Sequence, residues 1–213
     1  MLRVVNDLLQ HKGLMLKTGT AVDATLISAP SSTKNASGER DPEMKQSKKG
    51  NQWYFGMKAH IGVDAESGLV HSVRGTAGNV NDVVEANQLL HGEERVVFAD
   101  SGYRGANRRP DAKPGVDWQI ARRPSSRKPA ENQGRLGRLI DEIEHLKASV
   151  RAKVEHAFRV VNRQFGHTKV RYRGLAKNTA QLHTLFALTN LWLARRQLMA
   201  LDGQVRPQCL KAA

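Results

Sequence analysis

A strict alternation of apolar residues between Trp53 and Val63 is the feature that most constrains the fold of this chain. Every odd position in this segment is apolar, and the even positions include Lys58 and His60. A period of two is typical of a β-strand with one buried face. Residues 64–68 have turn-forming chemistry, and a Val-containing segment follows at 69–76. The pattern therefore predicts a β-hairpin.

Before the hairpin, the chain contains one helical segment, one strand and a polar stretch. The apolar spacing over 2–16 predicts a helix, and residues 21–27 form a β-rich run. Residues 28–52 are rich in Ser, Pro, Lys, Gly and Asn, which predicts a long polar loop. We expect a residual N-terminal helix over 1–17, a main domain over 18–200 and a flexible tail over 201–213.

After the hairpin, the predicted elements alternate between helices and short strands. They are a helix capped by Asn81 or Asp82 and running to 90, strands over 95–100 and 115–121, a mobile connection over 122–133, a long helix over 136–165 ended by Gly166, and a last helix over 179–199 that is apolar nearly all round. A hairpin beside strand–helix crossovers predicts an α/β fold with a mixed β-sheet flanked by helices.

Positive charge is concentrated in one part of the chain. The 213 residues carry a net charge of +14, and the isoelectric point is about 10.3. Residues 101–177 hold 19 basic and 7 acidic side chains, whereas residues 1–100 hold 11 basic and 12 acidic ones. Such a one-sided excess favours a polyanionic partner, most often nucleic acid. The alternative is a solvated basic surface without a ligand.

Cysteine content and apolar run lengths indicate the compartment. The single cysteine, Cys209, cannot form an internal disulfide, which favours a reducing environment. No Cys/His spacing typical of zinc is present, so we do not expect structural zinc. The N-terminus lacks the pattern of a signal peptide, and the longest apolar stretch, 185–194, is too short to span a membrane. We therefore expect a cytoplasmic protein without membrane contact.

Three acidic residues stand out by position. Asp23 lies inside the first predicted strand, Asp100 ends the strand over 95–100, and Glu155 lies on the long helix. If the two strands are neighbours, Asp23 and Asp100 approach each other, and a helix packed across the sheet edge adds Glu155. Mg²⁺ or Mn²⁺ would balance this charge, because both prefer oxygen ligands. Two such ions can promote attack of a water or a 3′-hydroxyl on a phosphodiester.

Each of these acids also has a structural interpretation. Asp23 could be a surface acid on an edge strand, and Asp100 could cap the helix that follows. Glu155 has Arg151 and Arg159 at i−4 and i+4, a spacing typical of a salt-bridged helix face. Spacing alone leaves both interpretations open for all three residues.

Five sequence blocks, taken together and in order, resemble a known family. They are Ala21-Val-Asp-Ala-Thr-Leu-Ile27, Arg40-Asp-Pro-Glu-Met44, Lys48-Lys-Gly-Asn-Gln-Trp-Tyr-Phe-Gly-Met-Lys-Ala-His60, Ala99-Asp-Ser-Gly-Tyr-Arg-Gly105 and Arg151-Ala-Lys-Val-Glu-His156. The chain resembles bacterial insertion-sequence transposases of the IS5 group, within the IS4-type DDE transposases. The resemblance runs from about residue 18 to residue 200.

The resemblance implies a ribonuclease-H-like DDE catalytic domain over 18–200. Asp23, Asp100 and Glu155 would be the catalytic and metal-binding triad for two Mg²⁺ ions, with Mn²⁺ as an alternative. The implied reaction is metal-dependent cleavage and strand transfer of insertion-sequence ends in the bacterial nucleoid. The implied partner is double-stranded DNA, both terminal repeats and target, with a homo-oligomer on DNA left open. The basic residues expected to bind DNA are Arg104, Arg122, Arg123, Arg127, Lys128, Arg151, Arg159, Arg163, Lys169, Arg171 and Arg173.

The chain departs from the family pattern in two ways. In the pattern Y-x2-R-x3-E-x6-K, Arg151 and Glu155 match, but Ala148 and Asn162 stand where Tyr and Lys are usual. Arg159 or Arg163 is a candidate substitute. Family members also usually carry a helical region before the first catalytic Asp, so we expect a shortened transposase.

Two other functions remain open at this stage. A shortened chain could be a non-catalytic DNA-binding remnant, or an inhibitor that pairs with the intact transposase. A general ribonuclease-H-like nuclease is the third interpretation, and the block over 48–60 disfavours it.

Overall fold

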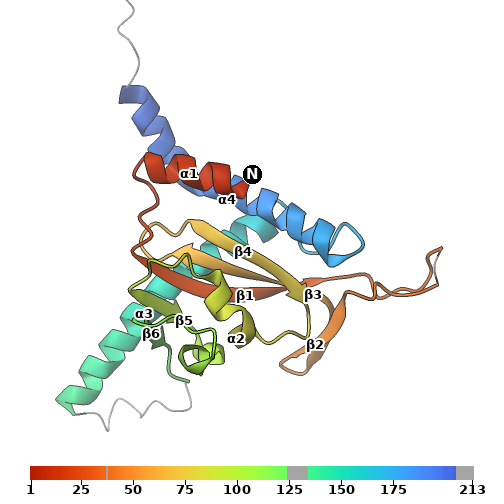
Figure 1. Ribbon diagram of the computed structural model, residues 1–213, viewed down its shortest axis with the longest axis horizontal. Coiled ribbons are helices and arrows are strands. Elements are labelled where there is room, and N and C mark those ends of the chain that lie inside the picture. The colour runs from red at the N-terminus through yellow and green to blue at the C-terminus, as the bar shows by residue number, and fades with distance from the viewer. Residues whose placement is uncertain (37, 124–133, 205–213) are drawn as a thin grey trace, which may run out of the picture.

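The computed structural model describes residues 1–36, 38–123 and 134–204. It confirms a mixed α/β fold, in which a six-stranded mixed sheet is flanked by helices in an arrangement consistent with a ribonuclease-H-like fold (Figure 1). The strands are β1 (Gly19–Ser28), β2 (Lys45–Lys49), β3 (Gln52–Asp64), β4 (Val70–Ala77), β5 (Val96–Ala99) and β6 (Asp117–Ile120). Their order is β2-β3-β1-β5-β6, and β4 also pairs with β3.

The helices vary in length and type. The α-helices are α1 (Leu2–His11), α2 (Asp82–Glu85), α3 (Arg135–Arg159) and α4 (Leu175–Gln204). The short 3₁₀ helices among the described residues are η1 (Ala86–Leu89), η2 (Ser101–Tyr103) and η3 (Ala106–Arg108), and a π-helical segment, η6 (Val160–Gln164), continues α3.

The predicted hairpin is confirmed as β3 and β4, which pair antiparallel. The odd positions Met57, Ala59, Ile61 and Val63 are fully buried, as the alternation requires. The expectation of one solvated face was wrong for the second half of β3, because His60 is also fully buried. Helices cover both faces of the sheet at this point, so an even position can be polar and still buried.

The expected polar loop over 28–52 contains a strand, which corrects the prediction. Residues 45–49 form β2 and pair antiparallel with the start of β3. The two-residue turn between them begins with Gly50, whose φ of +61° favours glycine. The sequence of β2 is Lys-Gln-Ser-Lys-Lys, and it has no apolar alternation that would indicate a strand.

Strand β1 lies in the interior of the sheet. It pairs antiparallel with β3 on one side and parallel with β5 on the other. The expectation that the first strand and the 95–100 strand are neighbours is therefore confirmed. The alternative interpretation of Asp23 as an acid on an edge strand is wrong.

Two hydrophobic cores lie on opposite faces of the sheet. On one face, Ala21 of β1 packs in the same core as Phe158 of α3 and Phe186 of α4. On the other face, Val22 of β1 packs with Leu89 and Tyr103 from the short helices. In Figure 1, α3, α4 and α1 lie on one side of the sheet and α2 on the other. Successive residues of β1 therefore face different layers.

Helix α1 is shorter than predicted, because it ends at His11 rather than near residue 16. It packs against α4 and β4 through a buried amide network. Asn190 of α4 donates from Nδ2 to Asn6 Oδ1 at 2.8 Å, and its Oδ1 accepts from the Val70 backbone N–H at 2.8 Å. This network ties the N-terminal helix to the sheet.

The two long helices are less buried than expected. Leu136 is 73% exposed and Leu146 is 65% exposed, because the first half of α3 extends past the sheet (Figure 1). The first buried residue of the predicted apolar stripe is Val154. Helix α4 spans a longer range than 179–199, and Trp192 on it is 40% exposed. Its apolar residues cover all sides, but only one side packs on the sheet.

Several expectations lie wholly or partly outside the described residues. They concern residues 124–133 of the connection, residues 205–213 of the tail, and Cys209. Residues 201–204 belong to α4, so they are not part of the tail predicted over 201–213. Within the described part of the chain, no helix is long and apolar enough to cross a membrane.

Candidate active site

Asp23 and Asp100 occupy matched positions on neighbouring parallel strands. Gly19 of β1 lies opposite Val96 of β5, and Ala21 lies opposite Phe98. The same register, continued by two residues, sets Asp23 opposite Asp100, which directly follows the last residue of β5. Adjacent strands are about 4.8 Å apart. The two carboxylates therefore stand side by side, Asp23 in the middle of β1 and Asp100 just after the end of β5.

Local hydrogen bonds orient both carboxylates. Asp23 Oδ1 accepts from the Ala24 backbone N–H at 2.8 Å, and Asp100 Oδ1 accepts from the Gly102 N–H at 2.8 Å. The second bond caps η2, so the structural interpretation of Asp100 as a cap is confirmed. A carboxylate has two oxygens with about four acceptor sites, so one such bond leaves capacity for a cation.

The electrostatic environment of Asp23 favours a cation. The pKa of Asp23 is raised to about 6, mainly by burial and also by the negative charge of Asp100, whereas the Ala24 N–H and the Arg151 guanidinium oppose the rise. A raised carboxyl pKa means that the ionised form is destabilised. A divalent cation would remove this cost, and an all-oxygen donor set fits Mg²⁺ or Mn²⁺.

Helix α3 brings Arg151 and Glu155 to the same face of the sheet as Asp23. Val154 and Phe158 fix the helix in the core that also contains Ala21. Because side chains alternate along a strand, Asp23 faces the same layer as Ala21. Arg151 lowers the pKa of Asp23, which puts its charge close to that carboxylate.

Glu155 is ion-paired and solvent-exposed in this structure. Its Oε1 lies 3.7 Å from Arg151 Nη2, and its side chain is 61% exposed. The salt-bridge interpretation is thus confirmed for Arg151. Among the described residues, Asp23, Asp100 and Glu155 are not a group whose ligand atoms all lie within 4.8 Å of one another. The structure brings the two aspartates together and leaves Glu155 on the adjoining helix face.

Most of the predicted DNA-binding residues are exposed. Arg151 is half-buried, and Arg127 and Lys128 lie outside the described residues. The exposed ones are Arg104, Arg122, Arg123, Arg159, Arg163, Lys169, Arg171 and Arg173.

Some of these cationic side chains line two surface pockets. One of about 230 Å³ is lined by Arg40, Arg171 and Arg173, and one of about 610 Å³ by Glu155, Arg159 and Arg163. The first lies at the end of β1, because Val170 N–H donates to Ser28 O at 2.9 Å.

The π-helical segment η6 changes the spacing after Glu155. It spans Val160–Gln164 and includes both Asn162, where the family pattern has Lys, and Arg163. A π-turn inserts an extra residue relative to an α-helix and often occurs at functional sites. Counting by α-helical spacing therefore does not identify which side chain after Glu155 lies on the same face of the helix.

Sequence reasoning missed a polar cluster beside the aspartates. Asp82 Oδ1 accepts from Lys58 Nζ at 2.9 Å and lies 3.7 Å from His60 Nδ1, and its charge also raises the pKa of Asp23. The sequence indicates Asp82 only as a candidate helix cap. In the structure Asn81 has that role, because its side chain accepts from the Val83 N–H. The signal in the sequence was Lys58 and His60, two polar residues on the same face of an otherwise apolar strand.

His60 should make stability depend on pH. Burial lowers its pKa to about 4, against an unfolded value of 6.5, although Asp82 opposes the shift. Below pH 6.5 the unfolded chain therefore binds a proton that the native chain does not, and stability falls as pH decreases to 4. At pH 5 this loss is about 2 kcal/mol. Urea unfolding at pH 7 and pH 5 should show a smaller decrease for His60→Gln than for wild type, and equal decreases would contradict the prediction.

The family model for the transposase DDE domain matches residues 15–191. This range is most of the chain and includes the whole sheet, α3 and the three acids. No solved structure gives a significant match to the chain.

Proposed function

Because this chain belongs to the transposase DDE domain family, we propose that it cleaves the ends of an insertion sequence and joins them to target DNA, as an enzyme of the IS5 group. The observation that carries this proposal is the matched position of Asp23, inside β1, and Asp100, directly after the end of the neighbouring strand β5. A helix that carries Arg151 and Glu155 packs on the same face.

The three acids would hold divalent ions. Asp23 and Asp100 would supply oxygen ligands from the sheet, and Glu155 would supply the third carboxylate from α3. When bound, two Mg²⁺ or Mn²⁺ ions would activate the attacking hydroxyl and stabilise the leaving oxygen of the phosphodiester. The raised pKa of Asp23 supports this assignment, because burial and the charge of Asp100 destabilise the ionised carboxylate and a bound cation would remove that cost.

Arg151 would control the availability of Glu155. Its guanidinium is ion-paired with Glu155 and also acts on Asp23. It can therefore neutralise the acids before the ions bind. A phosphate of bound DNA would compete for the same guanidinium, because arginine binds carboxylate and phosphate with the same fork of donors. DNA binding would thereby release Glu155 toward the aspartates.

The basic side chains would hold the DNA backbone. Arg171 and Arg173 flank the end of β1, and Arg159 and Arg163 line the pocket that contains Glu155. Arg163 is our preferred substitute for the missing Lys of the family pattern, because η6 shifts the spacing there. Contacts of this kind fix the position of a duplex without reading its sequence.

The test uses the full chain and duplexes that carry the terminal repeats of its own insertion sequence, with scrambled duplexes as the control. We expect cleavage at the repeat ends only with Mg²⁺ or Mn²⁺. Binding by gel shift should weaken about 10³-fold between 50 and 200 mM salt, the value for about six phosphate contacts.

Two results would contradict the proposal. Binding to both duplexes without any cleavage would identify a non-catalytic DNA-binding remnant. Cleavage of RNA–DNA hybrids in preference to either duplex would identify a general ribonuclease-H-like nuclease.

A further inference from the structure

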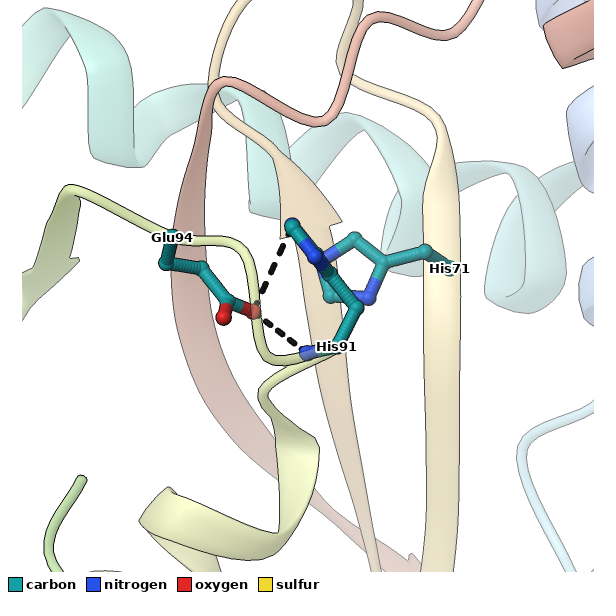
Figure 2. A group of neighbouring side chains, drawn as sticks. All are labelled: His71, His91 and Glu94. Carbon is teal, nitrogen blue, oxygen red and sulfur yellow. Dashed lines mark hydrogen bonds and ion pairs between the residues drawn. The ribbon is translucent and has the colours of Figure 1, made fainter.

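A second group of metal-ligating side chains lies away from the aspartates. His71, His91 and Glu94 each offer a ligand atom, and these atoms all lie within 4.8 Å of one another. Among the described residues, no other three His, Cys, Asp or Glu side chains meet this condition. Figure 2 shows His71 extending from β4 toward His91 and Glu94, which come from the segment that precedes β5. The group therefore joins parts of the chain that are distant in sequence.

The positions of the donor atoms suit a tetrahedral ion. His91 Nε2 lies 3.4 Å from Glu94 Oε1. The hydroxyl of Thr20 on β1 lies 3.0 Å from His71 Nε2 and 3.2 Å from Glu94 Oε1. For zinc–ligand bonds of about 2.05 Å, a tetrahedral site separates its donors by about 3.3 Å. The observed separations are already close to this value.

The surrounding groups position these side chains. Glu94 is buried, and its carboxylate accepts the backbone N–H groups of His91 and Gly92. His71 Nδ1 lies 2.9 Å from Ser72 Oγ, which leaves Nε2 for a ligand, the arrangement usual for a metal-binding histidine. On β3, Gly62 provides space for the ring, because a Cβ at that position would lie 2.8 Å from His71 Cε1.

One buried ligand atom of this group lacks a hydrogen-bond partner among the described residues. It is His91 Nε2, which is shielded from solvent. Leaving a buried polar atom without a partner is unfavourable, and a bound ion would supply one. Lys17 and Lys113 are the cations near His91, and Glu93 and Glu94 are the acids near it.

We propose that His71, His91 and Glu94 form a structural site for Zn²⁺ or a similar transition-metal dication, with Thr20 or a water as the fourth ligand. Two imidazoles and one carboxylate favour such an ion over Mg²⁺. The ion would link β4 and the segment before β5 at the start of β1. Asp23 lies three residues beyond Thr20 on β1 and faces the opposite layer. The sequence has no Cys/His spacing typical of zinc and therefore argues against structural zinc. Spacing could not reveal these ligands, because they come together only through the sheet.

The first test is zinc binding by the full chain after chelator treatment and dialysis. We expect one Zn²⁺ per chain by titration calorimetry. The melting temperature should rise by about 5–10 °C at a free Zn²⁺ concentration 100 times the dissociation constant. Co²⁺ should give the strong visible absorption of a tetrahedral site. Unchanged melting together with no stoichiometric binding would overturn the proposal.

Substitutions at the proposed ligands test where the zinc ion binds. His91→Gln should lose the zinc-dependent rise in melting temperature, and Glu94→Gln is a second variant at the same site. His183→Gln is the matched control, because His183 is also half-buried and lies outside the group. Asp100→Asn should bind zinc as wild type does. Binding that persists in His91→Gln and Glu94→Gln but is lost in Asp100→Asn would place the ion at the aspartates and overturn the proposal.

These measurements are independent of DNA cleavage. Zinc binding without DNA cleavage would support this site and contradict the proposed function. DNA cleavage without zinc binding would support the proposed function and contradict this site.

Discussion

Replacing Asp100 by asparagine should reduce Mn²⁺-dependent cleavage of terminal-repeat DNA by at least about 100-fold. Asp100 stands opposite Asp23 at the end of β5, and asparagine keeps an oxygen but not the negative charge. Metal-ion stabilisation of a transition state contributes several kcal/mol. Each 1.4 kcal/mol corresponds to about a tenfold change in rate. Losing a charged ligand from such a site therefore costs orders of magnitude in rate.

The substitution is chosen to spare the fold. Asparagine is as good an N-cap as aspartate, so the bond from the Gly102 N–H that begins η2 can be kept. The matched control is Asp117→Asn on β6, since Asp117 is exposed and lies away from the aspartate pair. We expect this control to cleave at the wild-type rate. Asp100→Asn that folds, binds DNA and cleaves as wild type does would remove Asp100 from the site.

The sequence predicted the elements that have strong apolar periodicity. The alternation over Trp53–Val63 corresponds to β3. Asp23 inside β1 and Asp100 at the end of β5 lie together because these strands are parallel neighbours. The strand β2 could not be predicted, because its residues are polar and are paired only through the backbone of β3. Periodicity indicates burial, so it misses a strand that is held by hydrogen bonds and faces solvent.

The site was predictable only in part. Asp23 and Asp100 could be found because a carboxylate inside or at the end of an apolar strand is unusual. Glu155 could not be placed, because its environment depends on how α3 is rotated and on its pairing with Arg151. Asp82 was indicated only indirectly, by Lys58 and His60 on β3. The group formed by His71, His91 and Glu94 has no sequence pattern, since sheet pairing brings its members together.

Replacing Gly56 by alanine should destabilise the protein by about 3 kcal/mol, at the upper end of typical overpacking costs. Gly56 of β3 pairs with Ser28 of β1. A Cβ at Gly56 would lie 2.1 Å from the Ile27 carbonyl oxygen and 3.0 Å from the Ala29 nitrogen. Both contacts are with backbone, so no side-chain rotation can relieve them, and β1 and β3 would have to separate.

Urea unfolding followed by circular dichroism measures this effect, with Gly134→Ala as the control. Among the described residues, no heavy atom lies within 4 Å of the Cβ position of Gly134. Gly134 precedes α3, where alanine is a poorer cap, so we expect a loss of at most about 1 kcal/mol. Wild-type stability in Gly56→Ala would mean that β1 and β3 do not approach so closely. The expected loss would explain why this glycine stands inside the block over 48–60. It permits the close contact between β3 and β1 at Ser28, five residues beyond Asp23 on the same strand.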